Sequence, residues 1–246
     1  MKNFKNLFLL ALAIGSMSLT SCLHILEEVT VKKDGSGTYK MTLDMSEIKS
    51  MMDMFKNMAP DSLSGDSTSM EMGGDSGMGE MGQQLSGVAS SLKGVSGLNN
   101  VKEINDTTLF NFGYSFDFAN VDALNKAMKV INKEKYDSKV DEVFKFNGKS
   151  FERLAAGDLG EEIKKALAEN EGEEADAEGG MEMMKNFFTD MTYKQVYHFP
   201  DREVKKSSNS LSELSDNGHT LTITLKPFDE EQQKQKVNVG TVVKLK

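Results

Sequence analysis

The chain contains a single thiol, Cys22, and the residues before it indicate what that thiol is for. Two lysines lie among the first five residues, residues 7–14 are apolar, and residues 16–21 are small and mostly polar. This layout predicts that residues 1–21 are a secretory signal peptide. The apolar run is too short to cross a bilayer as a helix, which needs about 20 apolar residues. With one cysteine, the chain cannot form an internal disulfide.

The end of this signal, "LTSC" at residues 19–22, resembles the lipobox of bacterial lipoproteins, in which an aliphatic residue and two small residues precede the cysteine. The resemblance implies that Cys22 is lipidated through a thioether, becomes the first residue and anchors the protein to a membrane. Leu23 rather than Asp after the cysteine is compatible with sorting to the outer membrane. Glu27 and Glu28 make a poor surface-export signal, so the leaflet stays open. The alternative is an ordinary signal peptide with an incidental cysteine.

Three other strings look like parts of reactive motifs, but each lacks groups that its chemistry requires. "KKDGSGTY" resembles part of a calcium loop, yet a lysine and a leucine stand where that loop needs acids. "GDSG" at 74–77 resembles the surroundings of a serine-protease nucleophile, yet the only upstream histidine is His24. "NGKS" at 147–150 echoes the end of a P-loop without its leading glycine. We therefore predict no catalytic residue.

The remaining histidines, His198 and His219, have no partner cluster in the sequence. Structural hydrogen bonds are the expected role for both, and we predict neither a metal site nor a cofactor. The favoured function is a non-enzymatic binding or structural module whose partner is an unknown envelope protein or small ligand. The alternative is an envelope hydrolase whose site is assembled from distant residues.

Methionine is unusually dense early in the chain, where 10 of the 17 methionines lie between residues 41 and 81. Thioethers are soft ligands that select Cu(I), so a methionine-rich Cu(I)-binding lipoprotein is a second alternative. The competing interpretation makes Met51, Met52 and Met58 ordinary helix hydrophobes and the following segment merely biased in composition.

The charge balance excludes one class of partner. Residues 1–21 hold two of the 29 basic residues and none of the 38 acidic ones, so their removal changes the formal net charge from −9 to −11. An acidic chain is a poor ligand for nucleic acid and for anionic lipid headgroups. No nucleic-acid partner is expected.

Alternating apolar and polar residues predict most of the strands. Residues 29–31 and 39–43 flank a glycine turn and predict a hairpin. "FNFGYSFDF", residues 110–118, is the clearest strand, and its five aromatics are expected to form the core face of a sheet rather than a sugar-stacking stripe. Residues 143–154 predict a second hairpin around Asn147-Gly148, of type I′. Further strands are expected at residues 193–199, 221–225 and 237–245.

Helices and linkers account for the rest. Ser46 and Asn120 are expected to cap helices with apolar positions three and four residues apart, and a short helix is expected from Asp158. Residues 59–82 have no periodicity, and residues 169–180 form an acidic linker. A helix rich in methionine and phenylalanine is expected around 181–189.

These elements together predict an α+β fold with a mainly antiparallel sheet built from hairpins, helices on one face, and disordered linkers. After the signal, the expected organisation is an anchor, hairpin and helix at 22–58, a flexible segment at 59–98 and a main α+β domain at 99–246. Residues 22–58 are expected to belong to the same domain.

The lipobox, "VTVKKDGSGTYKMTLDMS" and "FDFANVDALN" together resemble uncharacterised lipoproteins common in Bacteroidota. The closing "YHFPDREV" and "GHTLTITLKPF" resemble the LppM-type lipoprotein domain. The resemblance implies an envelope lipoprotein of unknown activity and supplies no catalytic residue.

Overall fold

The computed structural model describes residues 23–47, 49–50, 87–132, 142–155, 190–215, 217–234 and 238–246. Seven of its strands form one large sheet in the order β3-β4-β2-β1-β7-β10-β9. Their bounds are β1 His24–Val31, β2 Gly37–Asp44, β3 Leu98–Asp106, β4 Asn111–Phe118, β7 Thr192–His198, β9 Ser212–Leu214 and β10 Thr220–Leu225. Only β1 and β7 pair in parallel among the described strands, so the predicted α+β class with mainly antiparallel pairing is confirmed.

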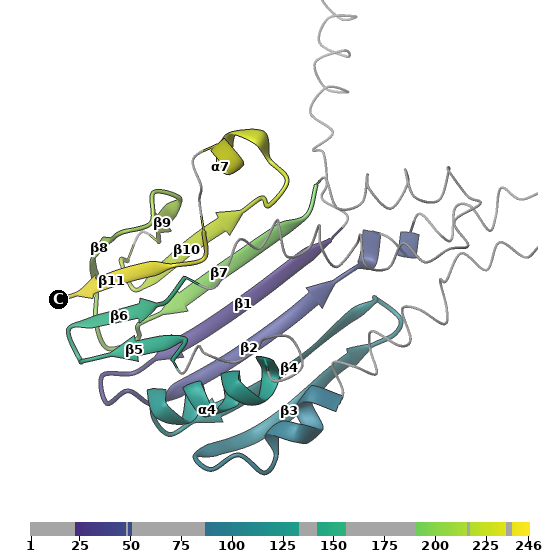
Figure 1. Cartoon of the computed structure of the whole chain (residues 1–246), viewed down its shortest axis with the longest axis horizontal. Helices are drawn as coiled ribbons and strands as arrows, with labels where there is room; N and C mark the ends of the chain where they lie inside the picture. The colour runs from purple at the N-terminus through teal and green to yellow at the C-terminus, as the bar shows by residue number, and fades with distance from the viewer. Residues whose placement is uncertain are drawn as a thin grey trace, which may run out of the picture.

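A second layer covers one face of this sheet (Figure 1). It consists of the helix α4 (Val121–Asn132) and a four-stranded sheet in the order β5-β6-β11-β8. The bounds of these strands are β5 Phe144–Phe146, β6 Ser150–Arg153, β8 Val204–Ser207 and β11 Thr241–Leu245, and a short helix α7 (Glu230–Lys234) follows β10. The sequence predicted helices on one face but not a separate second sheet.

The core lies between the two layers and is rich in aromatic rings. Phe144 and Phe151 of the small sheet stack with their centroids 5.6 Å apart, and Phe151 also packs on Tyr197 at 5.3 Å. In the large sheet, Tyr39 stacks on Phe116 at 5.1 Å. Burying each large apolar side chain stabilises the fold by roughly 1.5–3 kcal/mol, so these rings are a main source of stability.

Strand β4 carries most of the predicted aromatic stripe. Four of the five rings, Phe112, Tyr114, Phe116 and Phe118, are at least 96% buried because their relative exposures are 1–4%. Phe110 differs from the prediction. It precedes β4, has a left-handed backbone with φ 51°, and is only partly buried. The reason is that the β3–β4 turn ends at Phe110, so the alternation of the strand begins one residue later.

Helix α4 begins as predicted and is tied to the small sheet. The Asn120 side chain accepts a hydrogen bond from the Ala123 amide at 2.9 Å, which caps the helix. The buried Asn125 accepts from the amides of Val143 and Phe144 at 3.0 and 2.9 Å and donates to the Phe144 carbonyl at 2.8 Å. A single side chain therefore pairs with the start of β5 much as a neighbouring strand would.

The hairpin between β5 and β6 is confirmed, but its turn lies one residue later than expected. The Asn147 amide donates to the Ser150 carbonyl at 3.2 Å, which leaves Gly148 and Lys149 as the loop. Gly148 has φ 79°, whereas Asn147 is absent from the described residues with positive φ. A positive φ at the first loop position suits a type II′ turn rather than the predicted type I′.

One predicted boundary differs from the structure. Residues 87–92 are helical, Ala89 and Leu92 are buried in the core, and β3 already begins at Leu98, although the sequence placed all of these residues in the flexible segment 59–98. The sequence did not predict this helix because its few apolar residues lie in a stretch rich in serine and glycine. The predictions for residues 1–22, 51–86, 133–141 and 156–189 lie outside the described residues.

Candidate functional site

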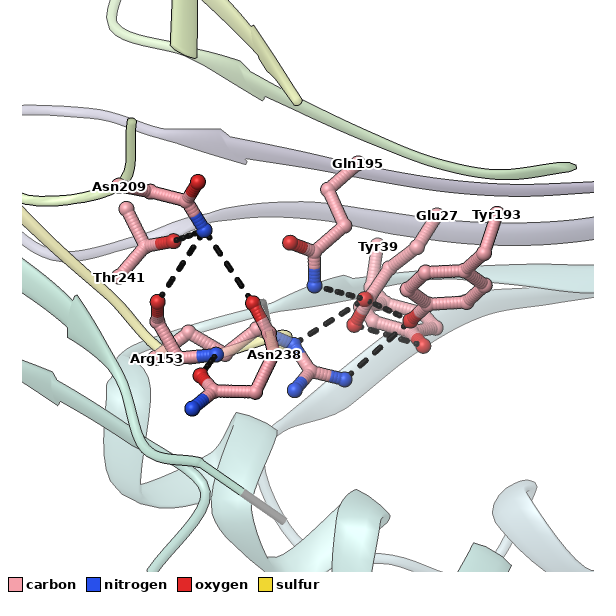
Figure 2. A network of polar contacts seen from close by, with 9 residues as sticks. Glu27, Tyr39, Arg153, Tyr193, Gln195, Asn209, Asn238 and Thr241 are labelled. Carbon is pink, nitrogen blue, oxygen red and sulfur yellow. Dashed lines mark hydrogen bonds and ion pairs between the residues drawn. The ribbon is translucent and has the colours of Figure 1, made fainter. Parts of the chain in front are cut away.

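A cluster of buried polar side chains between the two layers is the most unusual feature of the core (Figure 2). Glu27 of β1 is at its centre and is 1% exposed. Its Oε2 accepts hydrogen bonds from Arg153 Nε at 3.1 Å, from Gln195 Nε2 at 3.3 Å and from the Tyr193 hydroxyl. Its Oε1 accepts from the Tyr39 hydroxyl at 3.3 Å. A buried carboxylate costs several kcal/mol unless it is paired, and here four donors surround it.

Sheet register explains why these residues meet. Glu27 pairs with Gln195 in the parallel β1–β7 ladder and with Met41 in the β1–β2 hairpin. Side chains of paired residues point to the same face, and residues two apart share it, so Tyr39 and Tyr193 lie beside Glu27. All four side chains of the large sheet thus face the second layer.

Arg153 brings the opposite charge from that second layer. It lies on β6, forms the ion pair with Glu27, and donates through Nη2 to the Tyr193 hydroxyl at 3.2 Å. Its guanidinium carbon lies 5.8 Å from the centre of the Phe144 ring. Only 11% of its side chain is exposed. The ion pair therefore joins the two sheets across the core.

The charges in the cluster shift the pKa of each neighbouring group. Burial raises the pKa of Tyr39, Tyr114, Tyr193 and Tyr197 above the ordinary value, and the negative charge of Glu27 raises each further. Burial acts to lower the pKa of Arg153, but Glu27 and the tyrosines outweigh it, so the pKa of Arg153 is raised. The tyrosines stay neutral and the arginine stays charged at physiological pH.

Three polar atoms around the cluster have no hydrogen-bond partner among the described residues. They are Arg153 Nη1, Gln195 Oε1 and the Tyr197 hydroxyl, all buried. Gln195 and Tyr197 are both 0% exposed. An orphaned buried polar group costs about 1–3 kcal/mol, so the described residues alone do not satisfy every polar atom of the cluster.

A second polar contact fixes the chain that leads into β11 (Figure 2). The Asn209 side-chain amide donates to the carbonyls of Asn238 and Gly240 at 3.2 and 3.4 Å and to Thr241 Oγ1 at 3.4 Å. The Asn238 side chain in turn accepts from the Gly240 amide at 2.8 Å. These bonds hold the segment whose next residues pair with Arg153 and its strand.

The arrangement favours structural chemistry over catalysis. Both oxygens of the Glu27 carboxylate are already occupied, because they accept four hydrogen bonds from the protein. Glu27 and Gln195 are sealed from solvent, so a substrate has no direct access to them. What the cluster can do is fix the relative position of the two sheets through one directional charge pair.

The three histidines of the chain, His24, His198 and His219, lie outside this cluster. His24 and His198 are on the opposite face of the large sheet, where their Nδ1 atoms contact Thr192 at 2.7 Å and Thr220 at 3.1 Å. His198 Nε2 also lies 3.9 Å from Glu28, which pairs with Lys40 at 2.9 Å.

His219 is held in a loop rather than on a strand. Its Nδ1 lies 3.0 Å from the Phe199 carbonyl and 2.8 Å from the Arg202 carbonyl, so it donates to the backbone. None of the contacts described for His198 and His219 is to the other histidine. The hydrolase alternative would need a carboxylate hydrogen-bonded to one of them. His198 lies 3.9 Å from Glu28, which is too far for a hydrogen bond. The carboxylate near His219, that of Glu203, has its pKa lowered chiefly by its pairing with Lys246.

The other motif candidates have structural roles where they can be seen. Asp34 accepts hydrogen bonds from the amide and hydroxyl of Ser36 at 3.0 and 2.7 Å, which lower its pKa and close the β1–β2 turn. "NGKS" forms the β5–β6 turn. Cys22, the "GDSG" string and eight of the ten clustered methionines lie outside the described residues.

The described residues contain neither a metal-binding cluster nor a membrane-spanning helix. Within the ranges given above, no group of three or more His, Cys, Asp or Glu side chains is placed to hold a metal ion. Nor is any helix in those ranges long and apolar enough to cross a membrane.

Sequence reasoning missed the Glu27 cluster, although a signal was present. Glu27 is in phase with Val29 and Val31 on the face predicted to be apolar, and Gln195 stands between Tyr193 and Tyr197 in the same way. A charged or amide side chain in phase with apolar neighbours is a sign of a buried polar contact. The sequence does not say which residue supplies the partner.

Comparison with known proteins assigns this chain to no family. No protein-family model and no curated protein matches the chain. Among solved structures, the chain is similar to the NMR structure of the folded domain of Mycobacterium tuberculosis LppM, with 10% sequence identity and a TM-score of 0.40 over 92% of this chain and 90% of that one. The likeness is faint, as is the LppM-type resemblance of the sequence. Relationship to lipoproteins of the Bacteroidota type stays a prediction.

Proposed function

We propose that this protein is a lipoprotein of the cell envelope, held at a membrane by lipid on Cys22, and that its folded domain is a non-enzymatic binding or structural module. The observation that carries the proposal is the position of the anchor relative to the fold. Leu23, the next residue, is only 7% exposed, and its carbonyl accepts a hydrogen bond from the Thr192 amide at 3.0 Å. The central strand β1 begins at His24.

This connection has a mechanical consequence for a lipidated protein. A typical anchored domain on a flexible tether can move away from the bilayer by the length of that tether. Here the chain enters the core of the domain within two residues of Cys22, so the fold is held against the membrane surface. The outer membrane is the membrane we propose, on the sorting argument from Leu23.

Two features support a non-enzymatic role. The buried polar cluster around Glu27 is closed and its carboxylate is saturated with donors. The histidines that a hydrolase would use are bound to threonines and backbone carbonyls in different places. The partner we propose is an envelope protein or a small ligand, and affinity capture from a detergent extract of envelopes is the way to find it.

Replacement of the anchoring thiol tests the proposal directly. Cys22→Ser should abolish incorporation of labelled palmitate, because a hydroxyl cannot form the thioether, and the product should become soluble or stay uncleaved. Stable attachment requires two or more acyl chains at about 0.8 kcal/mol per buried CH₂, so partial acylation should release the protein. Ser21→Ala is the matched control because it keeps a small residue and should still be labelled. Continued labelling of Cys22→Ser would exclude the proposal.

A further inference from the structure

The turn between β3 and β4 presents an apolar side chain to solvent. Leu109 is 58% exposed and, with Leu214 at 50%, is one of two large hydrophobic residues exposed among those described. The neighbouring Phe110 is partly exposed. A single exposed leucine needs no explanation by itself, so its meaning depends on where the turn lies.

Sheet register places this turn at the same end of the molecule as the anchor. One row of paired residues crosses the large sheet at that end, namely Asp106, Asn111, Asp44, His24 and Thr192. The turn 107–110 and Leu23 both lie just beyond this row, and Figure 1 shows the start of β1 and the β3–β4 turn at the same end. Strands β1 and β4 are separated only by β2, so they lie about 10 Å apart.

Hydrogen bonds fix the conformation of this turn. The Asp106 side chain accepts hydrogen bonds from the amides of Thr108 and Leu109, both at 2.9 Å. The Phe110 carbonyl accepts from the Met45 amide at 2.9 Å. These bonds hold Phe110 at φ 51°, a conformation that usually belongs to glycine or asparagine and is strained for an aromatic residue. An aromatic kept at such a position next to an exposed leucine points to a role for the exposed tip.

We propose that Leu109, with Phe110 behind it, inserts into the membrane interface beside the lipid anchor. The proposal rests on lipidation of Cys22, because only the anchor brings this end of the sheet to the bilayer. Anchoring makes the second contact intramolecular, so even one leucine and part of a phenylalanine suffice to fix the orientation of the domain. The strands then stand away from the membrane, and the opposite end of the sheet is the part presented to a partner.

The charges around the turn define the kind of lipid. Asp44, Glu47, Asp106 and Asp190 lie at this end among the described residues. The cations there include Lys226, which follows β10, and Lys49, whose ammonium lies 5.8 Å from the Phe110 ring centre. This mostly acidic rim disfavours anionic headgroups, so the contact is apolar and suits zwitterionic lipid.

The two exposed leucines provide a matched pair of probe positions. In the register of the sheet, Leu214 lies opposite Leu221, Leu221 lies opposite Tyr197, and Tyr197 lies opposite Val29. Val29 is five residues along β1 from His24. At about 3.3 Å per residue, Leu214 is therefore about 17 Å farther from the anchor than the row that contains His24. In the lipidated protein the Cys22 thiol is consumed, so Leu109→Cys or Leu214→Cys supplies a unique thiol for an environment-sensitive fluorophore. The labelled lipoproteins are inserted into phosphatidylcholine vesicles.

Quenching then reports the depth of each probe. The probe at Leu109→Cys should be quenched several-fold more strongly by nitroxide-labelled lipid than by iodide, and the probe at Leu214→Cys should show the reverse. A Leu109 probe as open to iodide as the Leu214 probe overturns the proposal. Two lipid-quenched probes also overturn it, because the domain would then lie flat.

Failure of lipidation gives a different result from failure of this inference. Without lipid, Cys22 keeps its thiol, each variant takes up two labels, and the protein stays out of the vesicles.

Leu109→Ser tests insertion without a probe in the turn. The melting temperature should stay within a few degrees of the native value, since the side chain packs on little. A probe at Leu214→Cys in the same lipoprotein should gain rotational freedom. Unchanged probe anisotropy in that variant contradicts insertion.

Discussion

At the scale of single residues, the Glu27–Arg153 pair is the contact that decides how the two layers meet. Apolar packing between the sheets is not directional, so it allows small shifts of one layer over the other. The ion pair and the hydrogen bond that Arg153 donates to the Tyr193 hydroxyl permit one relative position. A buried pair of this kind contributes little net stability, because its desolvation offsets its attraction. We expect its role to be specificity of packing.

A double-mutant cycle tests this role. Arg153→Met leaves the Glu27 carboxylate buried without its cation, and Glu27→Leu leaves Arg153 buried without its anion, so each should lower the free energy of unfolding by about 3–5 kcal/mol. Glu27→Leu should cost more, because Tyr193, Tyr39 and Gln195 also lose their acceptor. The double variant should be far more stable than the sum of the two losses predicts. Urea unfolding measures all three, and additive losses would show that the two charges are not coupled.

At the scale of elements, the sequence predicted the strands and the helix in which the apolar residues of the local pattern are the ones that are buried. The buried residues of β10 alternate cleanly and those of β4 do so apart from Gly113, and Asn120 caps α4 as expected. The short strands β8 and β9 escaped prediction because "VKKS" and "SEL" carry almost no apolar alternation. Strand β3 was not predicted either, since this edge strand is largely exposed and its pattern is mostly polar. Such strands form because a neighbour supplies the hydrogen bonds, which a local pattern does not record.

The aromatic strand offers a test at this scale. Phe116 is 1% exposed and stacks on Tyr39, so Phe116→Ala should lower the free energy of unfolding by about 3–5 kcal/mol. Phe110→Ala should cost much less, because Phe110 is partly exposed and lies before the strand. Thermal unfolding of both variants makes the comparison. Equal losses would mean that Phe110 belongs to the core face, as the sequence pattern alone suggested.

At the scale of the whole molecule, the pairing of β1 with β7 joins distant parts of the chain. His24 pairs with Thr192, and Glu27 meets Arg153, although 168 and 126 residues separate them. Neither pairing follows from local periodicity, which is why the α+β class could be predicted and the polar cluster could not. The same pairing places residues 24–44 in the middle of the sheet, between β4 and β7. The β1–β2 hairpin, which follows Cys22 closely in the sequence, is therefore part of the main fold.

The buried tyrosines make a prediction for this whole fold at high pH. Burial, and then the charge of Glu27, raise the pKa of Tyr39, Tyr114, Tyr193 and Tyr197 in the folded state. In the unfolded chain these hydroxyls ionise near pH 10. Above that pH the unfolded state loses protons that the folded state keeps, so stability is fully present below about pH 10 and falls as pH rises. Each tyrosine contributes about 1.4 kcal/mol per pH unit, which for four gives a loss of about 5–6 kcal/mol per unit.

Domains of ordinary stability, about 5–15 kcal/mol, should therefore unfold within about one to three units above pH 10, and tyrosinate absorbance should appear together with the loss of far-UV circular dichroism. Tyr197→Phe is the informative control, because its hydroxyl has no partner among the described residues. That variant should match or exceed the native chain in stability at neutral pH, since it removes an unpaired polar group. It should also lose stability less steeply above pH 10, with three titrating tyrosines in place of four. Tyrosinate absorbance that rises while the dichroism is unchanged would mean that these hydroxyls are open to solvent in the folded protein.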